Sequence, residues 1–280
     1  MLIISDRKVT QKTYNGKIHT RARGNFPQKS GNFVAMKEVT PFRFKQFQVS
    51  HSRSSMRVGV DGVLLGAWAT VPAWGTVLDV GTGCGLIALM CAQRSEGVRV
   101  TGIDVDAPSV EEAAANFAAS PWSERLEARL QDFMSMTESG SLQAIDKPVG
   151  RESGYDLIVS NPPYFDAGVG DPGADARLRA RHVAEFGPVE LLRRAPSLLS
   201  PGGRLAMIVP ADWLERLRSD ELRPVRLCRI YGSARRQIPN RLLIEFSRET
   251  LSLEETDLRI HEPDGSLSAT YHRLTDPFYL

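Results

Sequence analysis

Residues 161–164 read Asn-Pro-Pro-Tyr and directly follow a short apolar run at residues 155–160. An asparagine amide oxygen can accept one hydrogen of a planar amino group, and the carbonyl of Pro162 can accept the other. Proline fixes its own φ and restricts the residue before it, so this carbonyl is oriented before a substrate arrives. A Pro-rich turn alone is more often structural. If upstream signals agree, the pattern predicts a site for a planar amino group made by Asn161, Pro162, Pro163 and Tyr164, with the tyrosine ring against the substrate ring.

An upstream signal of this kind is present. Residues 77–80 read as a buried strand, residues 81–85 read Gly-Thr-Gly-Cys-Gly, and residues 86–92 continue with apolar helix formers. Glycines in a strand–turn–helix unit allow a tight turn and let a ligand approach the backbone closely. The spacing is not that of a phosphate loop and no lysine follows, which disfavours phosphate binding. We therefore expect Gly81, Gly83 and Gly85 to lie against a ligand.

Two aspartates accompany this turn. Asp104 ends the next expected strand, 98–104, and follows Gly85 by 19 residues. An acid in this position can accept hydrogen bonds from the two ribose hydroxyls of a nucleoside cofactor. Asp79 ends the strand before the turn and is expected to orient the turn or a ligand's amino group. Because the glycine turn, the acid and Asn-Pro-Pro-Tyr all occur at strand ends in this order, a turn that only packs a helix on a strand is the weaker interpretation.

With Asp132 added, these features resemble class I S-adenosylmethionine-dependent amino-group methyltransferases. Three further segments narrow the resemblance: Phe-Lys-Gln-Phe at 44–47, the stretch 56–69, and the ending 271–280. In this combination the chain is similar to the bacterial tRNA(Val) adenine N6-methyltransferases, which modify the adenine 3′ to the anticodon, at tRNA position 37. The similarity extends over roughly residues 40 to 280. Val60 stands where this family is expected to have threonine, so a hydroxyl contact is missing there.

The resemblance implies S-adenosylmethionine as cofactor and tRNA as partner. The glycines would then contact the methionine part of the cofactor, and Asp132 would accept from its adenine amino group, with Phe133 beside the ring. A helix cap is the competing interpretation of Asp132. Since the cofactor's methyl group is already activated, positioning should supply most of the catalysis. Hydrogen bonds from the substrate amino group to Asn161 and Pro162 would stabilise the charge that develops on its nitrogen.

The elements expected along the chain alternate between strands and helices. This order predicts an α/β, Rossmann-like class I methyltransferase fold: a mostly parallel, seven-stranded sheet with helices on both faces and a C-terminal antiparallel strand pair. Ligands then bind at the carboxyl ends of the strands, where both signature loops fall. The expected strands are 76–80, 98–104, 126–130, 155–160, 203–209, 225–231 and 241–247, and the expected helices are 61–70, 84–94, 108–119, 188–199 and 211–218.

Composition is that of an ordinary globular enzyme of 280 residues, with 42% hydrophobic and 24% charged residues. No apolar stretch is long enough to cross a membrane, and the N-terminus has no signal-like apolar core. The three cysteines have no metal-like spacing and are expected to be free thiols in a reducing cytoplasm. We expect a cytoplasmic monomer without metal or membrane contact.

Charge is unevenly distributed along the chain. Residues 1–45 hold ten basic and two acidic side chains, a net +8, whereas the remaining residues carry 25 basic and 31 acidic side chains, a net −6. Residues 1–35 show no hydrophobic period, which predicts a disordered basic tail before a single methyltransferase domain at 36–280. Such a tail favours a phosphate-backbone partner. An upstream extension without a role, starting before Met36, is an equal alternative.

The acceptor is less tightly defined by sequence. Asn-Pro-Pro-Tyr suits a protein glutamine as well as an adenine, but a helical partner-binding domain typical of glutamine methyltransferases is not visible here. No target-recognition region for DNA is visible either, and an unpaired anticodon-loop base costs little to extrude. RNA is therefore favoured, with protein glutamine N5-methylation and rRNA or DNA amino-methylation as alternatives. Basic residues expected at RNA phosphates, each of which could instead be a solvated surface residue, are Arg177, Arg179, Arg181 and Lys45.

Overall fold

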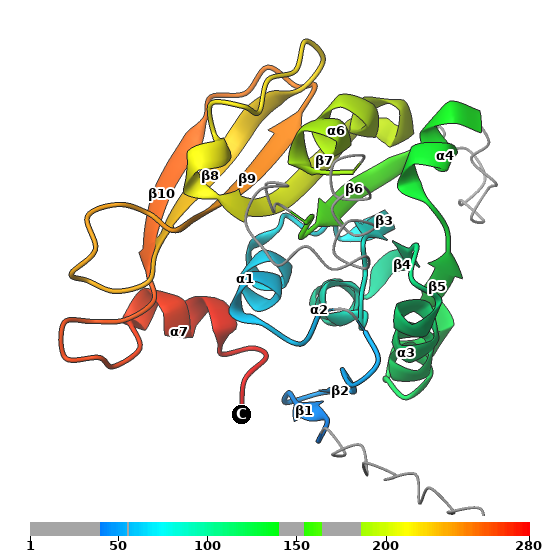
Figure 1. Ribbon diagram of the computed structural model, residues 1–280, viewed down its shortest axis with the longest axis horizontal. Coiled ribbons are helices and arrows are strands. Elements are labelled where there is room, and N and C mark those ends of the chain that lie inside the picture. Colours follow the sequence, from blue (N-terminus) through cyan, green and yellow to red (C-terminus); the bar gives the residue numbers. More distant parts are fainter. Residues whose placement is uncertain (1–39, 55, 140–153, 164–185) are drawn as a thin grey trace, which may run out of the picture. The chain divides into compact units, whose positions relative to one another are not determined.

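The computed structural model describes residues 40–54, 56–139, 154–163 and 186–280, and within them strands and helices alternate as predicted (Figure 1). The strands are β1 (Phe42–Arg43), β2 (Gln48–Val49), β3 (Trp74–Val80), β4 (Gly97–Asp104), β5 (Leu126–Leu130), β6 (Tyr155–Ser160), β7 (Leu199–Pro210), β8 (Arg223–Tyr231), β9 (Arg241–Ser247) and β10 (Glu254–Arg259). The helices are α1 (Val60–Trp68), α2 (Leu86–Arg94), α3 (Ala107–Ala118), α4 (Phe133–Ser139), α6 (Pro188–Arg194) and α7 (Ala269–Thr275), with short 3-10 turns at Ser123–Arg125, Ala195–Leu198 and Ala211–Trp213.

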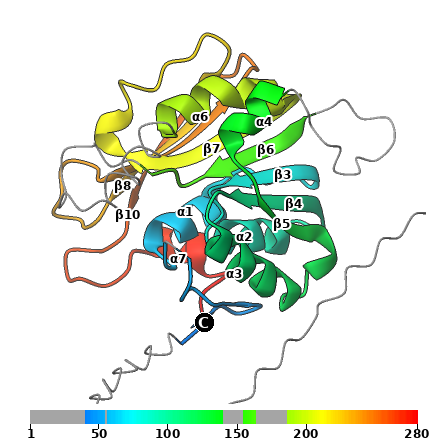
Figure 2. The ribbon, with the colours of Figure 1, turned by 45° about the vertical axis from the view of Figure 1, so that its right-hand side comes forward.

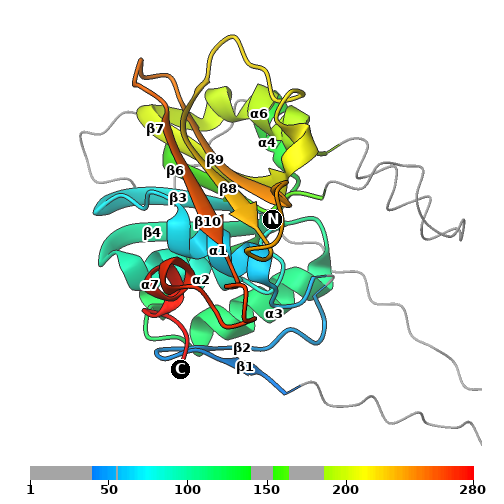
Figure 3. The same ribbon diagram turned by 90° about the vertical axis from the view of Figure 1, so that its left-hand side faces the viewer.

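One mixed sheet forms the centre of the protein. Its strand order is β10-β8-β9-β7-β6-β3-β4-β5, and β3 to β7 are parallel where they are neighbours. The antiparallel pair expected near the C-terminus is present as β8 and β9, and β9 is also antiparallel to β7. The predicted fold class is thus confirmed, with one difference. Among the described residues the sheet has eight strands rather than seven, because β10 pairs in parallel with β8 at the edge (Figure 3).

Helices cover both faces of the sheet. Successive residues of a strand point to opposite faces, and β3 shows the result: Val77 packs in a core with α1, α2 and α3, whereas Leu78 and Val80 pack in a second core with α6. Figure 2 shows α1, α2, α3 and α7 on one side of the sheet and α4 and α6 on the other. Two apolar cores therefore hold the parallel strands rigidly between them.

Helix α1 lies within the stretch 56–69 that contributes to the family resemblance, and its residues 62–68 are all buried. Its glycines permit close packing on α2. A Cβ atom at Gly66 would lie 2.7 Å from the sulfur of Met90, and one at Gly62 would lie 3.2 Å from a methyl group of Leu86. Since contacts below 3.0 Å force a neighbour to move, Gly66 is required for this helix–helix distance.

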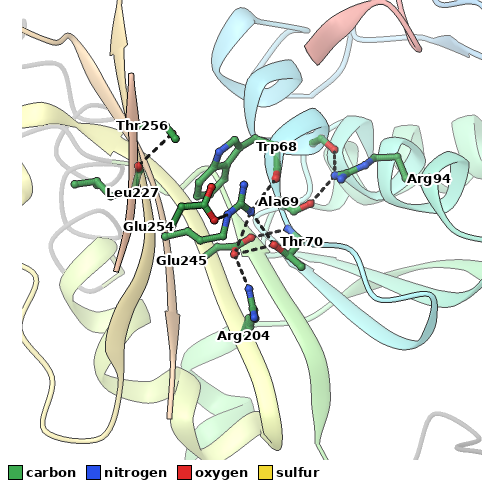
Figure 4. A network of polar contacts seen from close by, with 11 residues as sticks. Trp68, Ala69, Thr70, Arg94, Arg204, Leu227, Glu245, Glu254 and Thr256 are labelled. Atoms are coloured by element: carbon green, nitrogen blue, oxygen red, sulfur yellow. Dashed lines mark hydrogen bonds and ion pairs between the residues drawn. The ribbon is translucent and has the colours of Figure 1, made fainter. Parts of the chain in front are cut away.

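A buried carboxylate joins the end of α1 to the sheet. The side chain of Glu245, on β9, is fully buried and accepts hydrogen bonds from the backbone N–H of Thr70 at 2.5 Å and from its hydroxyl at 2.9 Å (Figure 4). Arg204 on β7 and Arg226 on β8 form ion pairs with the same carboxylate at 3.2 and 3.3 Å. The Arg226 guanidinium also lies 4.2 Å from the centre of the Trp68 ring. A buried charge of this kind requires such partners.

The Phe-Lys-Gln-Phe segment packs against the C-terminal segment. The ring of Phe44 stacks on Phe47 at 4.5 Å and on Tyr279 at 5.8 Å between centroids. The backbone N–H of Lys45 donates to the carbonyl of Phe278 at 2.8 Å, and its ammonium group donates to the carbonyl of Asp276 at 2.5 Å. The segments 44–47 and 271–280, which both contribute to the family resemblance, are thus in direct contact. Lys45 holds the C-terminal segment in place, and its contact with RNA stays a prediction.

Residues 211–218 do not form the helix that we expected. Only Ala211–Trp213 forms a 3-10 turn, and the next backbone hydrogen bond runs from the N–H of Arg216 to the carbonyl of Trp213, a separation of three residues. Trp213, Leu214 and Leu217 pack on the second core. These apolar residues therefore anchor a compact turn that leads into β8, although their spacing is also that of a helix.

Candidate functional site

The signature segments meet because of the register of three neighbouring strands. Val80, the last residue of β3, pairs with Ile103 of β4 on one side and with Ser160 of β6 on the other. The glycine turn, Asp104 and Asn161 follow these three residues directly and therefore lie side by side at the carboxyl edge of the sheet. Strand order reverses at β3, and ligands of open α/β sheets bind at this kind of switch point.

The glycine turn combines a left-handed backbone conformation with open space. Gly81, Gly83 and Gly85 have φ values of 70°, 54° and 82°, a region that favours glycine. A Cβ atom at Gly81 or Gly83 would meet no atom within 4 Å, whereas one at Gly85 would lie 2.4 Å from the Phe117 ring. The first two glycines thus leave room for a ligand against the backbone, and the third allows α2 and α3 to pack.

Asp104 lies where the sequence predicts a partner for ribose hydroxyls, at the end of β4. One carboxylate oxygen accepts from the backbone N–H of Gly83 at 2.9 Å and the other from that of Asp106 at 3.0 Å. Burial raises the pKa of this carboxyl, and these backbone hydrogen bonds oppose the shift. Each carboxylate oxygen has a second lone pair, so Asp104 can orient the turn and still accept from a ligand.

Asp79 is fully buried beneath the turn. Its Oδ2 accepts from the hydroxyl of Thr82 at 2.7 Å and from the backbone N–H of Ala88 at 3.2 Å. Its Oδ1 is buried and has no hydrogen-bond partner among the described residues. Burial raises the pKa of Asp79 to about 7, with hydrogen bonds from Thr82 and Ala88 acting in the opposite direction. Asp79 therefore orients the turn through one oxygen and leaves the other for a donor or a cation.

Asn161 has a comparable unpartnered oxygen. Its Oδ1 is buried and, among the described residues, accepts no hydrogen bond. The adjoining Pro162 is buried, and the hydroxyl of Ser160 donates to the carbonyl of Val80 at 2.8 Å, which ties β6 to β3. A buried amide oxygen without a partner is costly in a native structure, so Asn161 is suited to a hydrogen-bond donor that enters from outside. Tyr164 lies outside the described residues, as do Arg177, Arg179 and Arg181.

The contacts of Asp132 and Phe133 do not by themselves indicate a ligand site. The side chain of Asp132 accepts from the backbone N–H of Met134 at 3.0 Å at the start of α4, in the manner of a helix cap. Phe133 is buried in the second core with its ring 5.6 Å from that of Phe186. Their contact with the cofactor's adenine stays a prediction.

Two residues of α3 that were not predicted from the sequence hold the neighbouring chain in place. The amide of Asn116 donates to the carbonyls of Ser50 and of Cys84, both at 2.8 Å, and so joins residue 50 to the glycine turn. The carboxylate of Glu112 accepts from the backbone N–H groups of residues 52, 53 and 54 at 2.7 to 3.0 Å. Both side chains are buried. Polar residues on the otherwise apolar face of a helix were the sequence signal that could have indicated this role.

Other features of the described residues are weaker candidates for the functional site than the carboxyl edge of the sheet. A pocket of about 410 Å³ between residues 42–45 and α7 is lined by Lys45 and by residues of the ending 271–280, but contains no residue of the glycine turn and neither Asp104 nor Asn161. Burial raises the pKa of the Cys84 thiol to about 11, which makes it a poor nucleophile. Within the described ranges, no group of His, Cys, Asp and Glu is arranged to hold a metal ion, and no helix there is long and apolar enough to span a bilayer.

Comparisons with known proteins agree with this geometry. The family model for the methyltransferase small domain matches residues 62–215. The tRNA1(Val) (adenine(37)-N6)-methyltransferase of Aeromonas hydrophila is 40% identical over 249 residues, covering 85% of this chain and 97% of that protein. The enzyme of the same name from Porphyromonas gingivalis is 42% identical, with 85% and 94% covered.

A crystal structure from Agrobacterium tumefaciens, titled as a predicted O-methyltransferase, has a TM-score of 0.53 at 18% identity and covers 78% of this chain and 96% of its own. That likeness shows the fold alone. The relatives confirm the family resemblance found in the sequence: the chain belongs to the tRNA1(Val) (adenine(37)-N6)-methyltransferase family.

Proposed function

We propose that this protein transfers a methyl group from S-adenosylmethionine to the N6 amino group of adenine 37 in tRNA(Val). The observation that carries the proposal is the unpartnered, buried oxygen of Asn161, which follows β6 next to a glycine turn with open space at Gly81 and Gly83. Relatives that share most of the chain are named for this tRNA and this position, which is why we propose it as the substrate.

The residues present fit the cofactor. Gly81 and Gly83 leave the backbone accessible for its methionine part, and Asp104 would accept from its ribose hydroxyls. The free oxygen of Asp79 suits its ammonium group, because burial makes an uncompensated carboxylate costly. When bound, S-adenosylmethionine supplies a methyl group that its sulfonium centre has already activated. Asp132 and Phe133 are proposed to contact its adenine.

Asn161 and Pro162 act on the acceptor. An adenine amino group is a poor nucleophile because its lone pair is delocalised into the ring. Hydrogen bonds from its two hydrogens to Asn161 Oδ1 and the Pro162 carbonyl favour the pyramidal nitrogen, whose lone pair is available. The same bonds stabilise the positive charge that develops on nitrogen. The geometry needs no side-chain base, since water can take the proton once the nitrogen is cationic. Tyr164 is proposed to lie against the ring.

The cellular setting follows from the proposed substrate. A tRNA-modifying enzyme would act in the cytoplasm, and we propose that it does so as a monomer, with residues 36–280 as the methyltransferase domain. The basic residues 1–35, together with Arg177, Arg179, Arg181 and Lys45, are proposed to contact phosphates. Truncation to Met36 should then weaken the salt dependence of tRNA binding; no change would identify residues 1–35 as an extension without a role in RNA binding.

The experiment is methylation of an unmodified tRNA(Val) transcript with methyl-labelled cofactor, followed by mass spectrometry of the nucleosides. We expect N6-methyladenosine, and no label in a matched transcript that carries guanine at position 37. A release-factor protein in a parallel reaction tests the alternative substrate. Label on a protein glutamine, with none on tRNA, would replace this proposal with the glutamine methyltransferase function.

A further inference from the structure

Residues 232–240 connect β8 to β9 at the edge of the sheet where Asn161 lies. Strand β9 is antiparallel to both β7 and β8, so β8 runs in the same direction as β6 and β7. The carboxyl ends of β6, β7 and β8 therefore open on the same edge. Along this edge, the segment that follows β7 lies between the acceptor site and the connection from β8 to β9.

This connection is basic. Residues 232–241 contain Arg235, Arg236 and Arg241 and no acidic residue. The side chains of Arg235 and Arg236 are exposed, and in the described part of the chain neither lies within ion-pair distance of a carboxylate. Ile238, at 75% exposed, lies between them and β9. The guanidinium of Arg235 donates to the carbonyl of Pro263 at 3.4 Å. A single exposed isoleucine is ordinary on a surface, but beside two arginines that have no carboxylate partner in the described part of the chain it offers an apolar contact next to positive charge.

The connection is also held firmly at its base. The backbone N–H of Asn240 donates to the carbonyl of Ile230 at 2.7 Å, and its side-chain oxygen accepts from the N–H of Gly232 at 3.2 Å. The N–H of Ala211, directly after β7, donates to the carbonyl of Asn240 at 3.3 Å. The guanidinium of Arg241 donates to the carboxylate of Asp61 on α1 at 2.8 Å. The arginines are thus presented from an ordered turn rather than a loose tail.

The register gives the distance to the acceptor site. Ser160 pairs with Met207, and Pro210 pairs with Arg241. With strands about 4.8 Å apart and a rise of about 3.3 Å per residue, Arg241 lies about 12 Å from Asn161, and the connection begins one strand further out. A stem-loop whose extruded base is at Asn161 can reach this distance with its neighbouring phosphates.

Charge along the edge favours one direction of approach. The cofactor half carries Asp79, Asp104, Asp106 and Asp132, whereas the connection at 232–241 carries only positive charge. The turn after β10, further out along the sheet, carries Glu262 and Asp264 and would repel phosphate. The segment after β7, between the acceptor site and the connection, carries Asp212 and Glu215 together with Arg216 and Arg218. Residues 232–241 are therefore the one connection among these that carries basic and no acidic side chains.

We infer that residues 232–241 bind the phosphates of the anticodon stem-loop, through Arg235 and Arg236, with Ile238 in contact with a ribose or base. The inference rests on the proposed function and adds to it the surface that grips the RNA. Phosphate contacts position a nucleic acid without reading its sequence, so this surface sets affinity and register rather than the choice of base.

The test compares two double variants of the full-length protein in binding to a fluorescently labelled, unmodified tRNA(Val) anticodon stem-loop. Arg235→Glu with Arg236→Glu changes the proposed surface. Arg99→Glu with Arg223→Glu is the matched control, since both arginines are exposed and lie near the starts of β4 and β8, at the opposite edge. Binding is measured over a range of salt concentrations, and calorimetry with S-adenosylhomocysteine checks that each variant is folded.

We expect the first variant to bind the stem-loop at least about 10-fold more weakly at low salt, and to lower the slope of log affinity against log salt by about 2, one for each lost phosphate contact. Its KM for tRNA should rise while S-adenosylhomocysteine affinity stays unchanged. The control should match the wild type. Equal affinity and slope in both variants, from an enzyme that methylates tRNA, would overturn this inference alone. A wild type that neither binds nor methylates tRNA would overturn the proposed function as well.

Discussion

Two buried oxygen atoms at the carboxyl edge, Asp79 Oδ1 and Asn161 Oδ1, lack a hydrogen-bond partner among the described residues, and they differ in chemistry. The aspartate lies under the glycine turn, in the proposed cofactor half, and burial raises its pKa to about 7. The asparagine follows β6, in the proposed acceptor half, and cannot ionise. The first oxygen therefore suits a cation and responds to pH, whereas the second suits a neutral amino group and does not.

This difference indicates how one sheet edge separates two ligands. An adenine amino group is neutral, because its lone pair is delocalised into the ring, so it needs acceptors for its two hydrogens rather than a counterion. An amide oxygen accepts hydrogens from a neutral amine and leaves its lone pair available. In the cofactor half the requirement is reversed, because a charged group must be held without reacting. A substitution in one half should therefore leave the function of the other half unchanged.

The largest effect is expected from Asn161→Ala. Removing one preorganised acceptor from a developing charge typically costs about 100- to 1,000-fold in kcat, and the amide contributes nothing to the cofactor half. Single-turnover methylation of tRNA measures the rate, and calorimetry with S-adenosylhomocysteine should give an unchanged Kd. Near-normal turnover would remove Asn161 from the acceptor site.

Asp79→Asn should change how stability depends on pH in the protein without ligand. A carboxyl whose pKa is raised by folding binds a proton more tightly in the folded state, so its stabilising contribution is present at low pH and is lost as pH rises through about 7. Between pH 5 and pH 8 the wild type should lose about 2–3 kcal/mol from this group. Urea unfolding of the two proteins measures the difference in stability, which should be smallest at pH 5, where Asp79 is protonated and resembles asparagine, and largest near pH 8; parallel pH profiles would contradict the raised pKa.

Asp104→Ala should weaken cofactor binding by about 1–3 kcal/mol, because buried ribose hydroxyls would lose their acceptor. Asp104 also fixes the turn through Gly83, so Asp104→Asn, which keeps an acceptor there, is the matched control. We expect the asparagine variant to retain part of the affinity in calorimetric titrations. If alanine leaves the Kd unchanged, the ribose lies elsewhere.

The smallest effect concerns two glycines with similar backbone conformations. Gly81→Ala and Gly85→Ala share the strain of a positive φ, about 1 kcal/mol or more. Only Gly85→Ala adds a clash, with the Phe117 ring. Thermal unfolding should therefore show the larger loss for Gly85→Ala, whereas cofactor titration should show a specific loss for Gly81→Ala. Equal losses of stability would contradict the clash at Gly85, and an unchanged cofactor Kd in Gly81→Ala would mean that the space at Gly81 is not reserved for a ligand.

The glycine turn could be placed from sequence, between β3 and α2, because glycines between an apolar strand and an apolar helix are a local pattern; its contact with the cofactor stays a prediction. Strand β10 could not be placed in this way, since four of its six residues are exposed and none of the usual alternation is present; only pairing with β8 makes it a strand. The helix predicted at residues 211–218 was wrong for the opposite reason: a local pattern was present, but apolar residues spaced as in a helix also fit a tight turn. The unpartnered oxygens of Asp79 and Asn161 depend on tertiary burial, which the sequence does not specify.

The separation of the two halves is tested most directly by titrating S-adenosylhomocysteine into wild type, Asp79→Asn and Asn161→Ala between pH 5 and pH 7.5. Below pH 7 an ammonium ligand must displace the proton of Asp79, so wild-type affinity should rise with pH by up to about 10-fold per unit and level off near pH 7. Asn161→Ala should follow the wild type, and Asp79→Asn should bind more weakly with little pH dependence. The same pH dependence in Asp79→Asn, or its loss in Asn161→Ala, would contradict the account.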